Sequence, residues 1–171
     1  MRLILAALPE EVKMAIEVMV KKTEPKTVAF ISMKGPYAQL VETFPKLYNW
    51  LRGKGYDPVG PPSGVYFNSP EMVPAEDLRW EVHCPISGDV APSGPNEQGL
   101  GVKRVEGAEM AATMHKGPFH EVGKIYGALV GWIMENGYEI AGPPEEVYLT
   151  DPAYTPAEEL LTEVRFPVRR R

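Results

Sequence analysis

The chain has 171 residues, 44% of them hydrophobic and 24% charged, which is typical of one soluble globular domain or of one domain built from two similar halves. Its formal net charge of −5 does not support generic electrostatic attraction to nucleic acid, and its single cysteine, Cys84, excludes a disulfide within the chain. No Cys/His group has zinc-ligand spacing and no apolar run is long enough to span a membrane. We therefore expect a cytoplasmic protein without a metal, a cofactor, direct nucleic-acid binding or a membrane partner.

The first elements in chain order are an N-terminal extension and two strands. We assign residues 1–14 to an N-terminal extension, in which Pro9-Glu10-Glu11 is a plausible helix start because proline and acidic residues suit the first turn. Met14 is an alternative start of the chain. Residues 15–21 alternate weakly and are β-branched, which predicts a strand, and residues 27–33 predict a second strand.

The next segments predict a helix followed by two further strands. Lys34-Gly35-Pro36 ends the second strand, and apolar residues at three- and four-residue steps predict a helix over residues 37–52, kinked or shifted by Pro45. A Gly-Pro-Pro connection leads into a short strand at residues 65–68. After a turn at residues 74–78, alternation predicts a last strand in which Trp80, Val82, Cys84 and Ile86 share one face.

The same pattern then occurs a second time. Residues 60–70 and 142–152 are versions of one stretch, and comparing residues 28–86 with 110–168 without a gap gives 21 identities in 59 positions. The second copy predicts a helix over residues 120–135 and strands at 146–150 and 162–168. An ungapped match of this length indicates an internal repeat, and two copies suggest a pseudo-twofold pair.

A segment rich in Gly, Pro, Asn and Ser separates the copies, and we interpret it as an exposed linker or mobile loop. The sequence therefore predicts an α+β fold of two βαββ repeats related by a pseudo-twofold axis, with antiparallel strands. Repeat one covers residues 15–86, the linker 87–101 and repeat two 102–168. Residues 169–171 form a basic tail, for which we expect a role in solubility.

This pattern resembles the GyrI-like family of small-molecule-binding domains, which includes the effector-binding domains of AraC-type and MerR-type regulators. The residues that carry the resemblance are 116–119, Trp132, 142–144, 146–152 and 162–168. It implies helices on one side of the strands and a ligand cleft between the halves on the other side. It also implies an acidic residue between aromatic walls that holds a cationic or planar aromatic compound. By position, Glu146 or Glu163 takes that role.

The resemblance is to the stand-alone members, because only 14 residues precede Ala15 and many members have a DNA-binding motif there. Some stand-alone members are implicated in hydrolysing cyclopropane-bearing toxins, so an enzyme stays a possible interpretation. Haem binding, known in a more distant relative of the fold, has no strong ligand here.

Strand alternation nominates a set of residues for the face away from the helices, independently of the family. It places Val147 and Leu149 on the helix side, and on the opposite face Tyr66, Asn68, Glu81, His83, Glu146, Tyr148, Glu163 and Arg165. Aromatic rings with carboxylates suit a flat cation, and a carboxylate in an apolar cleft suits general acid–base chemistry. For an enzyme, the catalytic candidates are Glu146, Glu163 and Tyr148.

Each candidate also has a purely structural interpretation. Tyr66 and Tyr148 can pack at the repeat interface, Glu163 and Arg165 can form an ion pair, Glu81 can pair across strands, and His83 can be a surface histidine. Position 64 is glycine in the first copy and position 146 is glutamate in the second, which suggests a site on one half only. For Glu145, which replaces Ser63, we favour a solvated turn residue.

Three hypotheses for function follow. The first is binding of a small hydrophobic, cationic or aromatic compound, for sensing or sequestering a toxic molecule. The second is hydrolysis of a reactive, cyclopropane-bearing small molecule by a cleft glutamate and tyrosine. The third is a protein-interaction module that inhibits a larger enzyme, with a protein partner.

Overall fold

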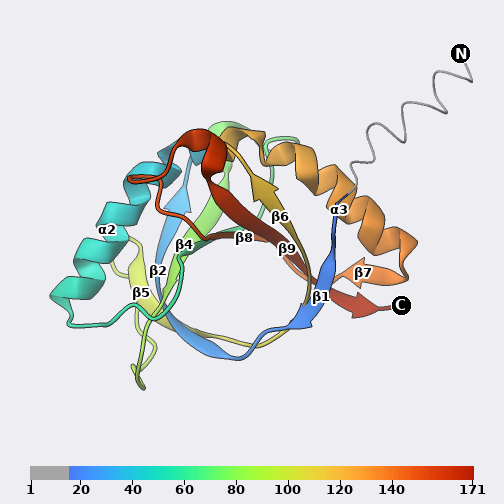
Figure 1. The fold of residues 1–171 in the computed structure, drawn as a ribbon. Helices are drawn as coiled ribbons and strands as arrows, with labels where there is room; N and C mark the ends of the chain where they lie inside the picture. Colours follow the sequence, from blue (N-terminus) through green and yellow to red (C-terminus); the bar gives the residue numbers. More distant parts are fainter. Residues whose placement is uncertain (1–15) are drawn as a thin grey trace, which may run out of the picture.

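The computed structural model describes residues 16–171, and its chain forms one strongly curved sheet with two helices (Figure 1). The predicted helix start at Pro9 lies outside the described residues. The helices are α2 (Leu40–Gly53) and α3 (Gly123–Glu135). The strands are β1 (Met19–Lys22), β2 (Lys26–Lys34), β3 (Ser63–Tyr66), β4 (Arg79–Pro85), β5 (Leu100–Val105), β6 (Glu109–Lys116), β7 (Tyr138–Ile140), β8 (Glu145–Tyr148) and β9 (Leu161–Arg170).

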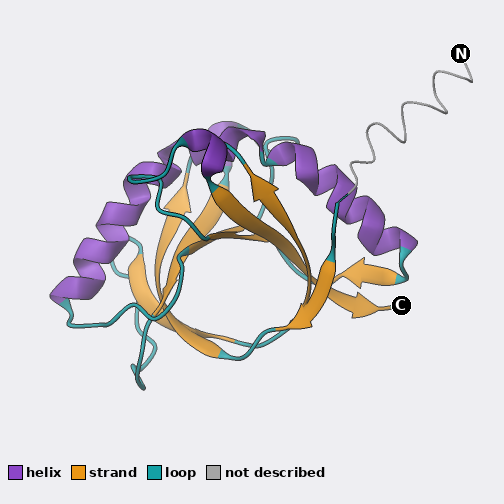
Figure 2. Cartoon of the chain, viewed as in Figure 1, coloured by secondary structure: helices purple, strands orange, loops and turns teal. Residues whose placement is uncertain are grey.

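The two helices lie against the outer surface of the curved sheet, as Figure 2 shows. We call this surface the helix face and the opposite surface the concave face. The predicted apolar stripes pack as expected: Leu47 and Leu51 of α2 are buried with Trp80, and Leu129 and Ile133 of α3 are buried in a second cluster. Burial of these side chains supplies most of the energy that holds the helices on the sheet. The α+β prediction, with mostly antiparallel strands and helices on one side, is confirmed.

The strand order is symmetric about its centre. All pairings between the described strands are antiparallel, and their order is β1-β6-β9-β8-β3-β4-β2-β5, with β7 beside β9 and off this path. Elements of the two copies also start at matching positions, since β3 begins at Ser63 and β8 at Glu145, 82 residues later. At the centre of the sheet Gly64 pairs with Glu146, its own equivalent in the other copy. An antiparallel pair in which equivalent residues face each other has local twofold symmetry at that point.

The first strand of each repeat pairs with the other repeat, which the sequence did not predict. β1 pairs with β6 of the second copy, and β5 pairs with β2 of the first copy. The spatial halves are therefore a first half of β5, β2, β4 and β3 and a second half of β1, β6, β9 and β8. Repeat one, taken as residues 15–86, contributes its leading strand to the second half.

Several predicted boundaries change in the structure. The first strand begins at Met19, and α2 and α3 are each preceded by a 3₁₀ turn, with Pro45 lying inside α2. The prediction of a separate basic tail is wrong for Arg169 and Arg170, which continue β9 beside the unpredicted strand β7. There Arg169 forms an ion pair with Glu139, and Arg170 lies over the ring of Tyr138.

The linker is exposed but folded back onto the sheet. Residues 91–98 are exposed, as predicted, whereas Leu100 and Gly101 are buried at the start of β5. Ser93 forms a bridge with Val102, and the side-chain oxygen of Asn96 accepts the backbone N–H groups of Gln98 and Leu100. A side chain at position 101 is excluded, because a Cβ there would lie 2.3 Å from the oxygen of Ser93.

Candidate functional site

The nominated residues do not share one face of the sheet. The register that pairs Gly64 with Glu146 and Tyr66 with Trp80 places Tyr66, Glu146 and Tyr148 on the helix face, so their predicted orientation is wrong. Glu81, His83, Glu163 and Arg165 are on the concave face, as predicted. The large phenol rings at positions 66 and 148, rather than Val147 and Leu149, fill the space under the helices because they bury more apolar surface.

Glu146 lies on the helix face and is bound only by tyrosine hydroxyls among the described residues. Tyr126 of α3 donates to its Oε2 at 2.5 Å, and Tyr148 donates to its Oε1 at 3.0 Å. The hydroxyl of Tyr66 is in hydrogen-bond contact with that of Tyr148, its equivalent in the other copy. The first copy thus contributes Tyr66 and the second copy Tyr126 and Tyr148 to a centre that holds a single carboxylate.

Gly64 explains why only one half supplies this carboxylate. A Cβ at position 64 would lie 2.5 Å from the hydroxyl oxygen of Tyr66 and 2.9 Å from that of Tyr148. Because equivalent positions meet at this point of the sheet, two side chains larger than hydrogen cannot both fit beside the tyrosine pair. The difference between Gly64 and Glu146, visible in the sequence, is therefore a steric requirement of the symmetric pairing.

Aromatic rings surround the Glu146 centre. Tyr37 lies edge-on to Tyr66 with ring centroids 4.9 Å apart, and Phe119, its equivalent, lies edge-on to Tyr148 at 5.1 Å. The ring of Phe44 of α2 also lies edge-on to that of Tyr148, with ring centroids 5.6 Å apart. We call this set, together with Glu146 and Tyr126, the helix-face site.

The electrostatics of Glu146 are unusual for a glutamate. The side chain is only 8% exposed and forms no ion pair with a described lysine, arginine or histidine. Burial raises the pKa of its carboxyl group, and the hydrogen bonds from Tyr126 and Tyr148 oppose that effect without cancelling it. Burial also raises the pKa of Tyr148 well above its ordinary value, so its hydroxyl stays protonated and able to donate.

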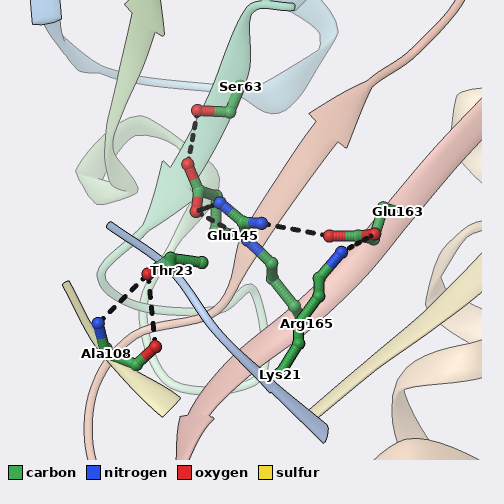
Figure 3. A network of polar contacts seen from close by, with 7 residues as sticks. All are labelled: Lys21, Thr23, Ser63, Ala108, Glu145, Glu163 and Arg165. Atoms are coloured by element: carbon green, nitrogen blue, oxygen red, sulfur yellow. Dashed lines mark hydrogen bonds and ion pairs between the residues drawn. The ribbon is translucent and has the colours of Figure 1, made fainter. Parts of the chain in front are cut away.

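Glu145, the neighbour of Glu146, has the opposite environment on the concave face (Figure 3). It is buried and not a solvated turn residue, since Arg165 donates to its Oε1 through Nη2 at 2.7 Å and Ser63 donates to its Oε2 at 2.6 Å. Burial raises the pKa of Glu145, but the positive charges of Arg165 and Lys26 and these hydrogen bonds outweigh burial and lower it. Arg165 also binds Glu163, which pairs with Lys21 at 2.6 Å.

The equivalent positions in the first half form a related ion-pair network. Lys103 and His83 both contact Oε1 of Glu81, with His83 Nε2 at 2.8 Å. Glu81 and Lys103 line an open pocket of about 420 Å³ together with Phe30 and residues 92–95 of the linker. Glu81 is thus paired with a lysine on another strand, and Glu163 with Arg165 as well as with a lysine, in line with the ion pairs that the sequence suggested as structural roles. His83 is buried rather than at the surface.

Asn68 belongs to neither network. Its side-chain oxygen accepts the backbone N–H of Arg79, and its backbone oxygen accepts the hydroxyl of Tyr37. It therefore holds the turn after β3 in place. Among residues 16–171 no group of three or more His, Cys, Asp or Glu side chains is placed to hold a metal ion. No helix in that range is long and apolar enough to cross a membrane.

The sequence analysis missed several residues of the helix-face site. The apolar stripe of the second predicted helix includes Tyr126, Tyr37 is the first residue of the first predicted helix, and Phe119 immediately precedes the second. One available signal was that Tyr126 is the polar version of Phe44 at the same position of the repeat. The second copy alone has a hydroxyl at this position and a carboxylate at position 146, where the first copy has Phe44 and Gly64. Two polar groups that occur together in one copy indicate a contact between them.

Comparison with known proteins gives a consistent assignment. The GyrI-like small molecule binding domain matches residues 16–169. The chain is 26% identical over 137 residues to a DNA gyrase inhibitor of Escherichia fergusonii, covering 78% of this chain and 87% of that protein. It is 29% identical over 136 residues to a DNA gyrase inhibitor of Citrobacter rodentium, covering 77% and 85%.

Solved structures share the fold. The EcmrR C-terminal domain superposes with a TM-score of 0.79 at 18% identity, covering 92% of this chain and all of that one. EcmrR in a DNA complex superposes with a TM-score of 0.81 at 18% identity, covering 99% of this chain and 63% of that one. SAV2435 bound to tetraphenylphosphonium superposes with a TM-score of 0.57 at 12% identity, covering 90% of this chain and 94% of that one. With the family matched over nearly the whole described chain, this protein belongs to the GyrI-like small-molecule-binding domain family.

Proposed function

We propose that the protein binds a small aromatic cation at the helix-face site, with Glu146 as the counter-charge. Family membership supports ligand binding in general. The choice of a cation rests on this chain's own residues. The biological role that fits such binding is sensing or sequestering a toxic compound.

The observation that carries the proposal is a buried carboxylate without a cationic partner. Glu81, Glu145 and Glu163 are each paired with a lysine or arginine, whereas Glu146 has only tyrosine hydroxyls among the described residues. A buried carboxylate that lacks a counter-ion is costly, and its raised pKa reflects that cost. A ligand cation between aromatic rings would supply the missing charge through an ion pair and cation–π attraction.

Ligand entry requires the site to open, because Glu146, Tyr66 and Tyr148 are all buried. Tyr126 is half-buried, as are Tyr37 and Phe119, and it comes from α3, whereas its partner Glu146 comes from the sheet. In this proposal the cation takes the place of the Tyr126 hydroxyl next to Oε2 of Glu146, so that α3 and β8 separate locally. The approach to the carboxylate is then from the helix side.

Tetraphenylphosphonium and its neutral relative triphenylphosphine oxide test the proposal by isothermal titration. We expect saturable binding of the cation, and Glu146→Gln to weaken it about tenfold to a hundredfold while the neutral compound is little affected. Glu163→Gln is the matched control, because Glu163 lies on the concave face in an ion pair. Equal cation affinity in the wild type and Glu146→Gln would refute the proposal.

Hydrolysis is the second candidate, favoured by the raised pKa of Glu146 and by the tyrosine hydroxyls that donate to it. Such a carboxyl suits a general acid or base. Glu163, the other catalytic candidate, is on the opposite face. Product release over many turnovers with a cyclopropane-bearing substrate, lost in Glu146→Gln, would favour the enzyme; binding without product favours the sensor.

Inhibition of a larger enzyme is the third candidate, and it rests on the relatives that carry the name DNA gyrase inhibitor. A supercoiling assay with purified gyrase tests it. Inhibition by the wild type that persists in Glu146→Gln would separate that activity from ligand binding. Shift assays with duplex DNA at low salt test the expectation that this chain has no direct nucleic-acid binding.

A further inference from the structure

The two ends of the helix-face site are built differently, although the repeat makes them equivalent. In the first half Trp80 stacks on Tyr66, with ring centroids 6.3 Å apart and planes 20° apart. Its indole N–H donates to the backbone oxygen of Gly35 at 3.0 Å. Trp80 is fully buried, so this end is closed by a third ring next to Tyr37 and Tyr66.

In the second half the equivalent of Trp80 is Thr162, 82 residues later. Thr162 is 0% exposed, and its hydroxyl oxygen has no hydrogen-bond partner among the described residues. It lies directly opposite Tyr148 in the β8–β9 register. A buried hydroxyl without a partner destabilises the fold, and nothing else in the described structure uses the hydroxyl at this position.

Tyr148 also lacks the stacked partner that Tyr66 has. Its described ring neighbours, Phe44 and Phe119, both approach at steep angles, with interplanar angles of 74° and 62°. The backbone oxygen of Gly117, the equivalent of Gly35, accepts no hydrogen bond from a described side chain, whereas that of Gly35 accepts the indole N–H. The second half therefore lacks one flat ring and one N–H donor relative to the first.

We propose that the ligand supplies this ring: a planar aromatic cation with N–H donors stacks on Tyr148 as Trp80 stacks on Tyr66, and donates to the Thr162 hydroxyl. The inference rests on the proposed function and adds the orientation and class of the ligand. Glu146 lies two residues from Tyr148 on the same strand and face, so a ring stacked on Tyr148 brings its charge toward that carboxylate. Thr162 is then a specificity-determining residue.

The proposal separates ligands that a simple cation site would treat alike. A planar cation with primary amino groups can donate to Thr162 Oγ1 and to the oxygen of Gly117. A planar cation of similar shape whose amino groups are fully methylated can stack and pair with Glu146, but its substituents cannot donate. Proflavine and acridine orange are such a pair, with the same acridine ring.

The test is a fluorescence titration of both dyes with the full chain. Wild type should bind proflavine more tightly than acridine orange, and Thr162→Val, which removes the hydroxyl at similar size, should weaken proflavine about fivefold to tenfold and leave acridine orange unchanged. Thr27→Val, on β2, is the control for the same substitution elsewhere. Equal losses for the two dyes, or no loss of proflavine, would overturn the role of Thr162.

A second variant, Thr162→Trp, places in the second half the residue that the first half has at this position. We expect it to fold, as measured by circular dichroism and thermal melting, and to lose both dyes because its indole takes the place of the ligand ring. Unchanged binding by the folded variant would overturn the stacking position. If it does not fold, the Thr162→Val comparison decides alone.

Loss of both dyes in Glu146→Gln, with unchanged affinities in the Thr162 variants, would leave the proposed function standing and refute only this inference. Absence of dye binding to wild type that still binds tetraphenylphosphonium would refute only this inference, and absence of tetraphenylphosphonium binding as well would refute both.

Discussion

Glu145 and Glu146 are neighbours on one short strand, and the sheet gives them opposite surroundings. Glu145 on the concave face is neutralised by Arg165, and its pKa is lowered; Glu146 on the helix face has tyrosine partners, and its pKa is raised. Both are buried. Burial alone therefore does not distinguish a structural carboxylate from a candidate site. The hydrogen-bond and ion-pair partners distinguish the two. A carboxylate that has a counter-ion within the fold is already neutralised, whereas a carboxylate that lacks one can accept a counter-ion from a ligand.

The largest expected effect comes from removing the counter-ion on the concave face. Arg165→Met leaves Glu145 buried without its cation, and we expect a loss of about 3–5 kcal/mol in the free energy of unfolding. Urea denaturation measures it. The double variant Arg165→Met with Glu145→Met should recover most of the stability, because a buried pair replaced by apolar residues is often neutral. A single variant as stable as wild type would show that Glu145 does not depend on this pair.

Gly64→Ala tests the steric account of the helix face. The new Cβ would push against the hydroxyl contact of Tyr66 and Tyr148, and we expect a loss of about 1–3 kcal/mol in the free energy of unfolding. Gly123→Ala is the control, because a Cβ there meets nothing within 4 Å. If both variants unfold at the same urea concentration, the tyrosine pair has more room than the contact distances indicate.

Glu146→Gln should stabilise the unliganded protein by about 1 kcal/mol at neutral pH, because it removes a buried carboxylate without a counter-ion. The amide oxygen still accepts from one tyrosine hydroxyl, and the amide N–H can donate to the hydroxyl oxygen of the other. Thermal melting without ligand measures the gain. Glu145→Gln is the matched comparison, and it should lower the melting temperature. A loss in both variants would mean that the two glutamates are equally satisfied.

The pH dependence should have opposite signs for the two glutamates. Since the folded pKa of Glu146 is raised above 4.5, its contribution to stability falls as pH rises from 4.5 through that raised value. The depressed pKa of Glu145 gives a contribution that is present above 4.5 and lost as pH falls through its folded value. Cation affinity should rise with pH through the raised pKa of Glu146. Melting curves of wild type and the two glutamine variants from pH 2.5 to 8 compare the signs, and affinity independent of pH would contradict the cation proposal.

The smallest effect is expected in the linker, which contains neither of the two glutamates compared above. Removing one residue from its exposed part, such as Ala91, should change the free energy of unfolding by less than about 0.6 kcal/mol. Gly101→Ala should cost more, because its Cβ would meet Ser93. Equal melting temperatures for the two variants would show that the linker is a simple spacer.

The fold could be predicted from the sequence because its signals are local and repeated. Helix stripes, Gly-Pro-Pro connections and the ungapped repeat depend on residue spacing, and α2, α3, β2 and β4 lie where spacing places them. The exchange of β1 and β5 between halves could not be predicted, since alternation within a strand does not identify its neighbour. β7 has only three residues, too few for a periodic signal.

The site was harder, for a physical reason. Alternation correctly separates the residues of one strand into two sets. Which set faces the helices depends on which one gains more free energy when it is buried there, and alternation does not show this. At β8 the set with Glu146 and Tyr148 lies under the helices because burial of the tyrosine ring outweighs the cost of burying the carboxylate, to which Tyr126 of α3 donates a hydrogen bond. Thr162 gives no sequence signal by itself. It becomes informative only when the repeat shows that Trp80 is its equivalent.

The exchange of β1 and β5 has a consequence for how the chain can be divided. A fragment that contains only repeat one would keep β1 but lack β5, the edge partner of β2. The same segment in a second identical fragment could provide that partner, because β1 and β5 are equivalent. A single repeat would thus be complete only as a pair of interlocked copies. The present chain resembles such a pair joined head to tail, with the linker as the seam, and cutting at the seam should give two pieces that fold together rather than alone.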